Sequence, residues 1–67
     1  MKPIKKARLL QGLSQAKLAR RIRVTQPMIS DFERGRLAPG PELRRRLSEA
    51  LGIPEALFFP PNEDEIE

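Results

Sequence analysis

Apolar residues recur at spacings of three and four in several short stretches of the chain, which is the pattern of amphipathic helices. Between residues 14 and 35 this pattern predicts two short helices joined by a tight turn. Ser14 and Thr25 precede them as expected N-caps, because a hydroxyl oxygen accepts a free amide proton of the opening turn. The apolar residues are Leu18, Ala19 and Ile22 in the first helix and Ile29 and Phe32 in the second.

The second of these helices has a polar face opposite its apolar residues. At about 100° per residue, that outer face holds Gln26 at its leading end, then Pro27, Ser30, Asp31 and Arg34. Two helices this close in sequence, the second with hydrogen-bonding groups in its N-terminal half, are typical of a helix-turn-helix.

Further helices are predicted on both sides of this pair. Pro3 is suited to the start of a first helix, because its missing amide proton would have no partner there, and Gly12 ends that helix. Pro41 and Gly52 bound a later helix, and a last short helix spans residues 55–59. The residues expected on the inner faces are Ile4, Ala7 and Leu10 in the first helix and Leu43, Leu47, Ala50 and Leu51 in the later one. Leu9 and Leu10 are adjacent and cannot both point inward, so the alternative is that one of them is exposed and available to a partner.

Length and composition restrict the class of protein. A chain of 67 residues makes one domain, near the smallest size at which a core is stable alone. It has no cysteine and no histidine, so disulfides are excluded and no zinc site or active site is expected. We therefore predict a protein without enzymatic activity, metal or cofactor. With no apolar run of membrane-spanning length and no signal sequence, we expect a cytoplasmic protein that makes no membrane contact.

The charges are divided unevenly along the chain. Residues 1–46 carry all 13 lysine and arginine residues and three of the nine acidic residues, a formal charge of +10. Residues 47–67 carry the other six acidic residues and no basic one. A basic body indicates a polyanionic partner; the alternative is a solvated surface with a solubilising tail. We predict a helical domain over residues 1–60 and a disordered acidic tail over residues 61–67.

Residues 5 to 58 resemble the Cro/repressor-type helix-turn-helix proteins, the XRE family. The similar positions are Arg8, Gly12 to Gln15, Leu18 and Ala19, Ile22 to Gln26, Ile29 and Ser30, Phe32 to Gly35, and Ala50 to Ile53. They are specific as a set and not singly. The resemblance implies a compact all-α domain of five helices, similar to that of lambda repressor, whose third helix enters the DNA major groove.

Such docking assigns roles to the polar residues of the pair of helices. The residues expected at base edges are Gln26, Pro27, Ser30 and Asp31. The residues expected at phosphates are Gln15, Lys17, Arg23, Thr25, Arg34 and Arg36. Asp31 is unusual, because phosphates repel a carboxylate, and only a hydrogen bond accepted from cytosine N4 or adenine N6 would compensate for that repulsion. For Gln26 the alternative is that it merely extends the cap of Thr25.

The resemblance also implies two structural features. In the family, an arginine at the position of Arg8 pairs with the glutamate that corresponds to Glu33; the alternative is two ordinary surface charges. The family usually has glycine where this chain has Arg23. If the backbone is left-handed there, a residue with a Cβ costs roughly 1 kcal/mol.

The C-terminal segment has more apolar residues than so short a domain buries easily. An apolar surface of this kind often marks an interface, so we predict a dimer interface formed by Ile53, Leu57, Phe58 and Phe59. The alternative is that all four cover the core. Two domains on half-sites about one helical turn apart bind DNA far better than one, which favours a homodimer on a two-fold operator.

The sequence therefore predicts a sequence-specific regulator of transcription that binds double-stranded DNA, such as a repressor. A second hypothesis is an antitoxin or another protein-binding module that acts on a protein partner through its C-terminal segment. RNA is a less favoured partner, because the aromatic side chains that stack on bases are nearly missing: three phenylalanines and no tyrosine or tryptophan.

Overall fold

The computed structural model describes the backbone of residues 3–58 and the side chains of residues 3–56. Within that span the protein is helical and has no strand, which confirms the all-α prediction. The helices are α1 (Pro3–Leu10), α2 (Gln15–Ile22), α3 (Gln26–Arg34), α4 (Pro41–Leu51) and α5 (Glu55–Phe58). Because α5 is a single turn of four residues at the edge of the described span, the five-helix arrangement stays a prediction. The predicted tail lies outside the described residues.

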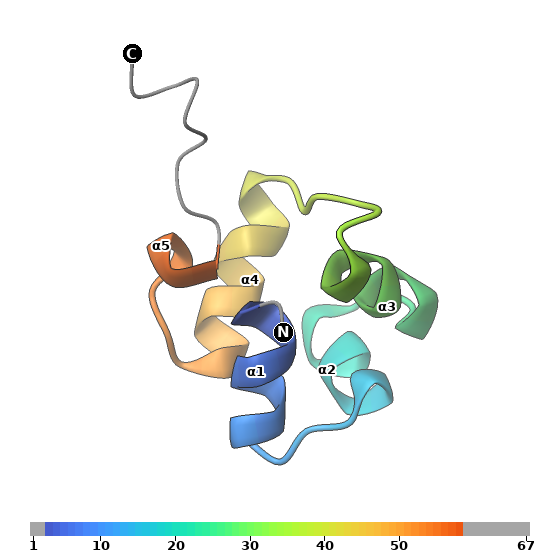
Figure 1. Ribbon diagram of the computed structural model, residues 1–67, viewed down its shortest axis with the longest axis horizontal. Helices are drawn as coiled ribbons and strands as arrows, with labels where there is room; N and C mark the ends of the chain where they lie inside the picture. Colours follow the sequence, from blue (N-terminus) through green and yellow to red (C-terminus); the bar gives the residue numbers. More distant parts are fainter. Residues whose placement is uncertain (1–2, 59–67) are drawn as a thin grey trace.

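The helices surround one core, with α1 in a central position. Figure 1 shows α2 and α3 next to each other on one side of the molecule and α5 on the opposite side, beyond α4. The α2 helix packs against both α3 and α4, whereas α1 contacts α3 and α5. The outer face of α3 is therefore turned away from the rest of the domain.

The core is built from the apolar stripes that the sequence pattern predicts. Ile29 of α3 and Leu18 of α2 are fully buried, and Phe32 is only 4% exposed. The other buried apolar residues are Ile4, Ala7, Leu13, Ala19, Ile22, Leu47 and Leu51. Each of the helices α1 to α4 thus contributes an inner face, and burial of these side chains is the main stabilising contribution to the fold.

One residue of the predicted inner face lies elsewhere. Leu10 is 79% exposed, so the prediction that it joins the core of α1 was wrong. The helix ends at Leu10, and the residues on either side of it, Leu9 and Gln11, are exposed as well. Leu13 takes the buried position instead, because the chain folds back after Gly12 and the Leu13 amide donates to the Arg8 carbonyl at 3.0 Å.

The ends of α2 and α3 and the turn between them are held by side-chain caps and by hydrogen bonds of the backbone. Ser14 and Thr25 cap the two helices, accepting from the amides of Lys17 and Met28 at 3.1 and 3.4 Å. Arg23 ends α2 in the left-handed region, with φ 63° and ψ 46°. It is the one residue with positive φ, other than glycine, among those described. The Val24 amide then donates to the Ala19 carbonyl at 2.9 Å, which closes the last turn.

We predict that Arg23→Gly leaves the free energy of unfolding unchanged or raises it by up to roughly 1 kcal/mol, because glycine relieves the left-handed strain of Arg23. The gain is limited, because glycine also increases the entropy of the unfolded chain. Denaturant melts of both proteins measure the difference. Arg20→Gly is the matched control: Arg20 is exposed inside α2, where glycine should cost about 1 kcal/mol. A clear loss of stability in Arg23→Gly would contradict the prediction.

Candidate nucleic-acid interface

The orientation of α3 follows from its two ends and its inner face. Thr25 caps the helix, Pro27 lies in its first turn, and Gly35 ends it with φ 77°. Ile29 and Phe32 are buried in the core. Because those two side chains are fixed inside, the opposite face of α3 must point outward. The residues of that face are themselves three and four positions apart in the sequence.

That outer face is part of an open hollow, which we call the recognition hollow. The residues that line it are Gln15, Gln26, Pro27, Ser30, Asp31 and Arg34. The hollow contains all four side chains predicted at base edges, together with two of those predicted at phosphates. Gln26, Pro27 and Arg34 are exposed, and the others are half-buried. The structure thus brings the predicted base-contacting residues to one surface.

The recognition hollow contains charges of both signs. Arg34 supplies a positive charge at the C-terminal end of α3, and Asp31 supplies a negative one a turn before it. Within the described residues, Asp31 takes part in none of the ion pairs of up to 4.0 Å. Its carboxylate is therefore available as an acceptor for a group that enters the hollow.

The remaining residues predicted at phosphates lie around α3. Lys17 is in the first turn of α2, and Arg23 and Thr25 lie in the turn that leads into α3; all three are exposed. Arg36 follows the helix and is exposed too, and its amide donates to the Asp31 carbonyl at 2.9 Å. Polar and basic groups therefore lie before and after α3. These positions are suited to contacts with the two phosphate backbones on either side of one nucleic-acid groove.

A buried ion pair joins α1 to the end of α3. Arg8 Nε donates to Glu33 Oε2 at 2.6 Å, and Arg8 Nη2 donates to Glu33 Oε1 at 3.1 Å. Arg8 Nη1 also donates to the Leu13 carbonyl at 2.8 Å. Arg8 and Glu33 are 6% and 8% exposed, so they are not two ordinary surface charges. A pair with two parallel hydrogen bonds fixes orientation as well as distance.

Gln15 is a third member of this network, and no pattern in the sequence pointed to it. Gln15 Nε2 donates to Glu33 Oε1 at 3.0 Å, across 18 positions of the chain. The phosphate role predicted for Gln15 is thereby restricted, because one of its two amide protons is already taken. Its second amide proton, its carbonyl oxygen and its backbone N–H remain, and its side chain lines the recognition hollow. Glu33 therefore orients a residue of the candidate interface.

A comparison with known protein families matches residues 4–58 of the chain to a helix-turn-helix family. This protein belongs to the Cro/repressor-type (XRE) helix-turn-helix family. Comparisons with curated proteins and with solved structures gave no match. Membership assigns the helix-turn-helix domain to DNA binding and, in general terms, to the regulation of transcription.

The electrostatics of Glu33 in the helix-turn-helix domain follow from its neighbours. Burial by itself would raise the pKa of this carboxyl group. Hydrogen bonds from Arg8 and Gln15, with the positive charges of Arg8 and Lys5, outweigh that effect and hold the pKa below its ordinary value of 4.5. Glu33 is therefore charged at neutral pH, although it is buried.

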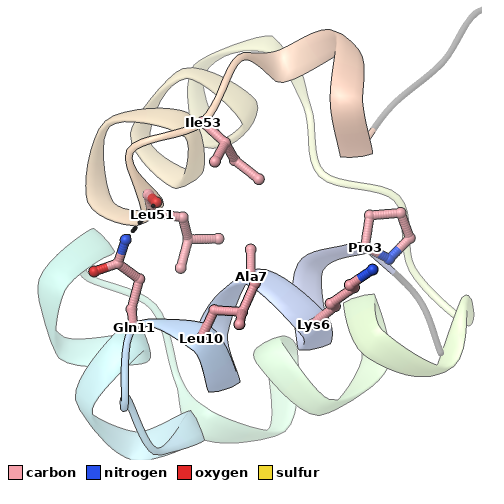
Figure 2. Close-up of a pocket in the computed structure, with 7 residues that line it drawn as sticks. All are labelled: Pro3, Lys6, Ala7, Leu10, Gln11, Leu51 and Ile53. Carbon is pink, nitrogen blue, oxygen red and sulfur yellow. Dashed lines mark hydrogen bonds between the residues drawn. The ribbon is translucent and has the colours of Figure 1, made fainter.

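A second hollow lies on the side of the helix-turn-helix domain where α1 meets the end of α4. Figure 2 shows Ala7 and Leu10 of α1 facing Leu51 and Ile53 across it, with Gln11 bridging the two sides. Gln11 Nε2 donates to the Leu51 carbonyl at 3.1 Å. Ile53, predicted at the dimer interface, lines this hollow. The side chains of Leu57 and Phe58, and the whole of Phe59, lie outside the part of the chain that the structure describes.

None of the described helices has the length and apolar character needed to cross a membrane. The described residues also hold no cluster of three acidic side chains placed to bind a metal ion.

We predict that Arg8→Ala lowers the free energy of unfolding by about 2–4 kcal/mol, because it leaves the Glu33 carboxylate buried without its partner. Arg45→Ala is the matched control, since the Arg45 side chain is 66% exposed and its ion pair with Glu42 is long, at 3.9 Å. It should change stability by less than about 1 kcal/mol. Denaturant melts of Arg8→Ala, Glu33→Ala and the double variant measure the coupling. Simple additivity of the two losses would show that the residues do not interact.

We also predict that the contribution of Glu33 to stability depends on pH. Because the pKa is lower in the folded protein than in the unfolded chain, this contribution is complete above the ordinary carboxyl value of 4.5 and is lost as the pH falls through the folded pKa. The stability difference between wild type and Glu33→Gln should therefore be largest near neutral pH and shrink below 4.5. Denaturant melts from about pH 7 to about pH 3 test this. A difference that stays constant over this range would exclude the lowered pKa.

Proposed function

We propose that this protein is a sequence-specific regulator of transcription that binds double-stranded DNA and places α3 in the major groove. The observation that carries the proposal is the recognition hollow, where the four side chains expected at base edges share one outward face. A major groove is wide enough to admit one helix. The basic residues of the first two thirds of the chain supply the charge that attracts the duplex.

Base recognition begins at the N-terminal end of α3 in this proposal. In helix-turn-helix docking, the N-terminal residues of the recognition helix contact base edges. Gln26 is the first residue of α3 and is exposed. Its amide offers a donor and an acceptor together, which match N6 and N7 of adenine. Pro27 has no backbone donor and adds apolar contact only.

Phosphate contacts hold the helix in register in this proposal. Lys17, Arg23 and Thr25 contact the backbone at the start of α3, and Arg34 and Arg36 contact it at the end. Gln15 contributes its backbone N–H at the N-terminus of α2, where the helix dipole favours an anion. These contacts set affinity and orientation, whereas the sequence preference comes from α3.

The small size of one domain favours assembly as a homodimer. One recognition helix covers few base pairs, whereas two domains on half-sites about one helical turn apart read a two-fold operator. We propose that this protein is a cytoplasmic repressor with the five-helix arrangement of lambda repressor. In this proposal it dimerises through Ile53 and the segment that follows Ile53. Ile53 lines the hollow of Figure 2, which supports an interface on that side, away from the recognition hollow.

One observation favours a second function. The hollow of Figure 2 has a volume of about 490 Å³ and is bordered by Leu10, which is 79% exposed. An apolar surface of this kind suits a protein partner, as in an antitoxin that binds its toxin. Tight, salt-sensitive binding of a duplex by the isolated protein favours regulation of transcription. Co-purification with a basic protein and weak duplex binding favours the alternative.

We predict that Gln26→Ala and Arg34→Ala change DNA binding in different ways. Gln26→Ala should cost about 1–3 kcal/mol on the preferred site, relax the preference at one base pair and leave the salt dependence nearly unchanged. Arg34→Ala should weaken binding to all sequences alike and reduce the salt slope by about one unit, because it removes one phosphate contact.

The measurement has two stages. Selection of bound duplexes from a random pool first identifies the preferred site. Binding titrations at several salt concentrations then compare both variants on that site and its single-base variants, with Glu49→Ala as control because Glu49 is exposed on α4. If Gln26→Ala keeps the base preference of wild type and loses only stability, Gln26 extends the cap of Thr25 and does not read a base.

A further inference from the structure

Pro27 and Asp31 are neighbours on the outer face of α3. They are four positions apart in the helix, a spacing that brings their Cβ atoms to about 5–6 Å. Both line the recognition hollow, and Asp31 belongs to none of the ion pairs found among the described residues. An apolar ring and a free carboxylate acceptor are thus presented together to whatever enters the hollow.

We propose that Pro27 and Asp31 together select one cytosine of the target sequence and accept that base with a methyl group at C5. This inference rests on the proposed function, since it requires α3 to lie in the major groove. Asp31 accepts a hydrogen bond from the N4 amino group. Pro27 packs against C5, the ring atom next to the carbon that carries N4.

The Asp31 carboxylate makes guanine, thymine and adenine less favourable than cytosine at this position. Guanine presents only acceptors in the major groove, and thymine presents its O4 acceptor, so both place lone pairs against the oxygens of Asp31. Adenine presents its N6 donor beside the N7 acceptor, which suits an amide such as Gln26 better than a carboxylate. Cytosine presents its N4 donor beside a C–H group and leaves no lone pair facing Asp31.

The proline explains why a C5 methyl group is accepted. Pro27 is exposed and lacks an amide proton, so it offers the base no polar group that a methyl would displace. Thymine and 5-methylcytosine both carry this methyl group, but only 5-methylcytosine keeps the amino group that Asp31 needs. The pair therefore distinguishes two bases that have the same apolar substituent.

A negative charge on α3 also affects unspecific binding. Phosphates repel Asp31 on every sequence, and only a base amino group compensates for that repulsion. Asp31 thus lowers the affinity for unrelated DNA more than the affinity for the correct site. Removal of the charge should increase unspecific binding while it decreases selectivity, a combination that loss of a structural contact would not produce.

The test uses the full chain and five forms of the selected duplex, with cytosine, 5-methylcytosine, thymine, adenine or guanine at the position assigned to Asp31. For the wild type we expect binding at least about tenfold weaker with thymine, adenine or guanine. With 5-methylcytosine we expect binding that is equal or up to about fourfold tighter, because one methyl group is buried.

Two variants assign the effects to their side chains. In Asp31→Asn, the preference for cytosine over thymine should fall to within about threefold, because an amide offers a donor as well as an acceptor, and unrelated DNA should bind more tightly. Pro27→Ala should lose the gain from the methyl group and keep the preference for cytosine. Thermal melts check that both variants fold. If Asp31→Asn does not fold, the affinities of the wild type for the five duplexes test the role of Asp31 by themselves.

Opposite results overturn the inference. A wild type that binds the thymine duplex as well as the cytosine duplex, or an Asp31→Asn variant that keeps the full preference, would exclude the role of Asp31. If Gln26→Ala then still relaxes another base pair, the proposed function stands without this inference. If the wild type also binds duplexes of unrelated sequence as tightly as the selected duplex, the proposed function and this inference fail together.

Discussion

A single buried carboxylate controls the geometry of this domain. Glu33, at the end of α3, accepts hydrogen bonds from Arg8 of α1 and from Gln15 of α2. Arg8 is held in turn by the Leu13 carbonyl in the loop between those helices. A charge buried in this way must keep its partners, because leaving it alone in the interior costs several kcal/mol. Three helices are thereby fixed relative to one another by directional contacts, in addition to apolar packing.

The same network reaches from the core to the candidate interface. Glu33 lies on the inner side of α3, and Gln15 lies both against it and in the recognition hollow. The orientation of the outer face of α3 therefore depends on contacts that lie between the helices. Arg46 of α4 adds another link, since its Nη1 donates to the Ile22 carbonyl at 3.3 Å, at the end of α2. The pair of helices is thus supported from two sides before any ligand binds.

Much of this structure follows from local rules that the sequence displays. Ser14, Thr25 and Gly35 mark helix ends because capping and left-handed turns depend on single residues. The Arg8–Glu33 contact could be expected only from the family resemblance, because its residues are 25 positions apart. The contact of Gln15 with Glu33 escaped prediction, since an amide near a helix start has several equally good partners. Leu10 was misplaced because periodicity gives the direction of a side chain, and not whether another helix covers it.

The outer face of α3 is built without its own side chains taking part in the fold. Of the residues expected at base edges, Asp31 supports the chain through its backbone carbonyl, which accepts from the Arg36 amide. Gln26 and Pro27 are exposed, and the buried side of the helix is formed by Ile29, Phe32 and Glu33. If α3 reads bases as proposed, substitutions on its outer face change operator preference at little expense in stability. A scaffold of this type can diverge into regulators of different target sites while its interior stays the same.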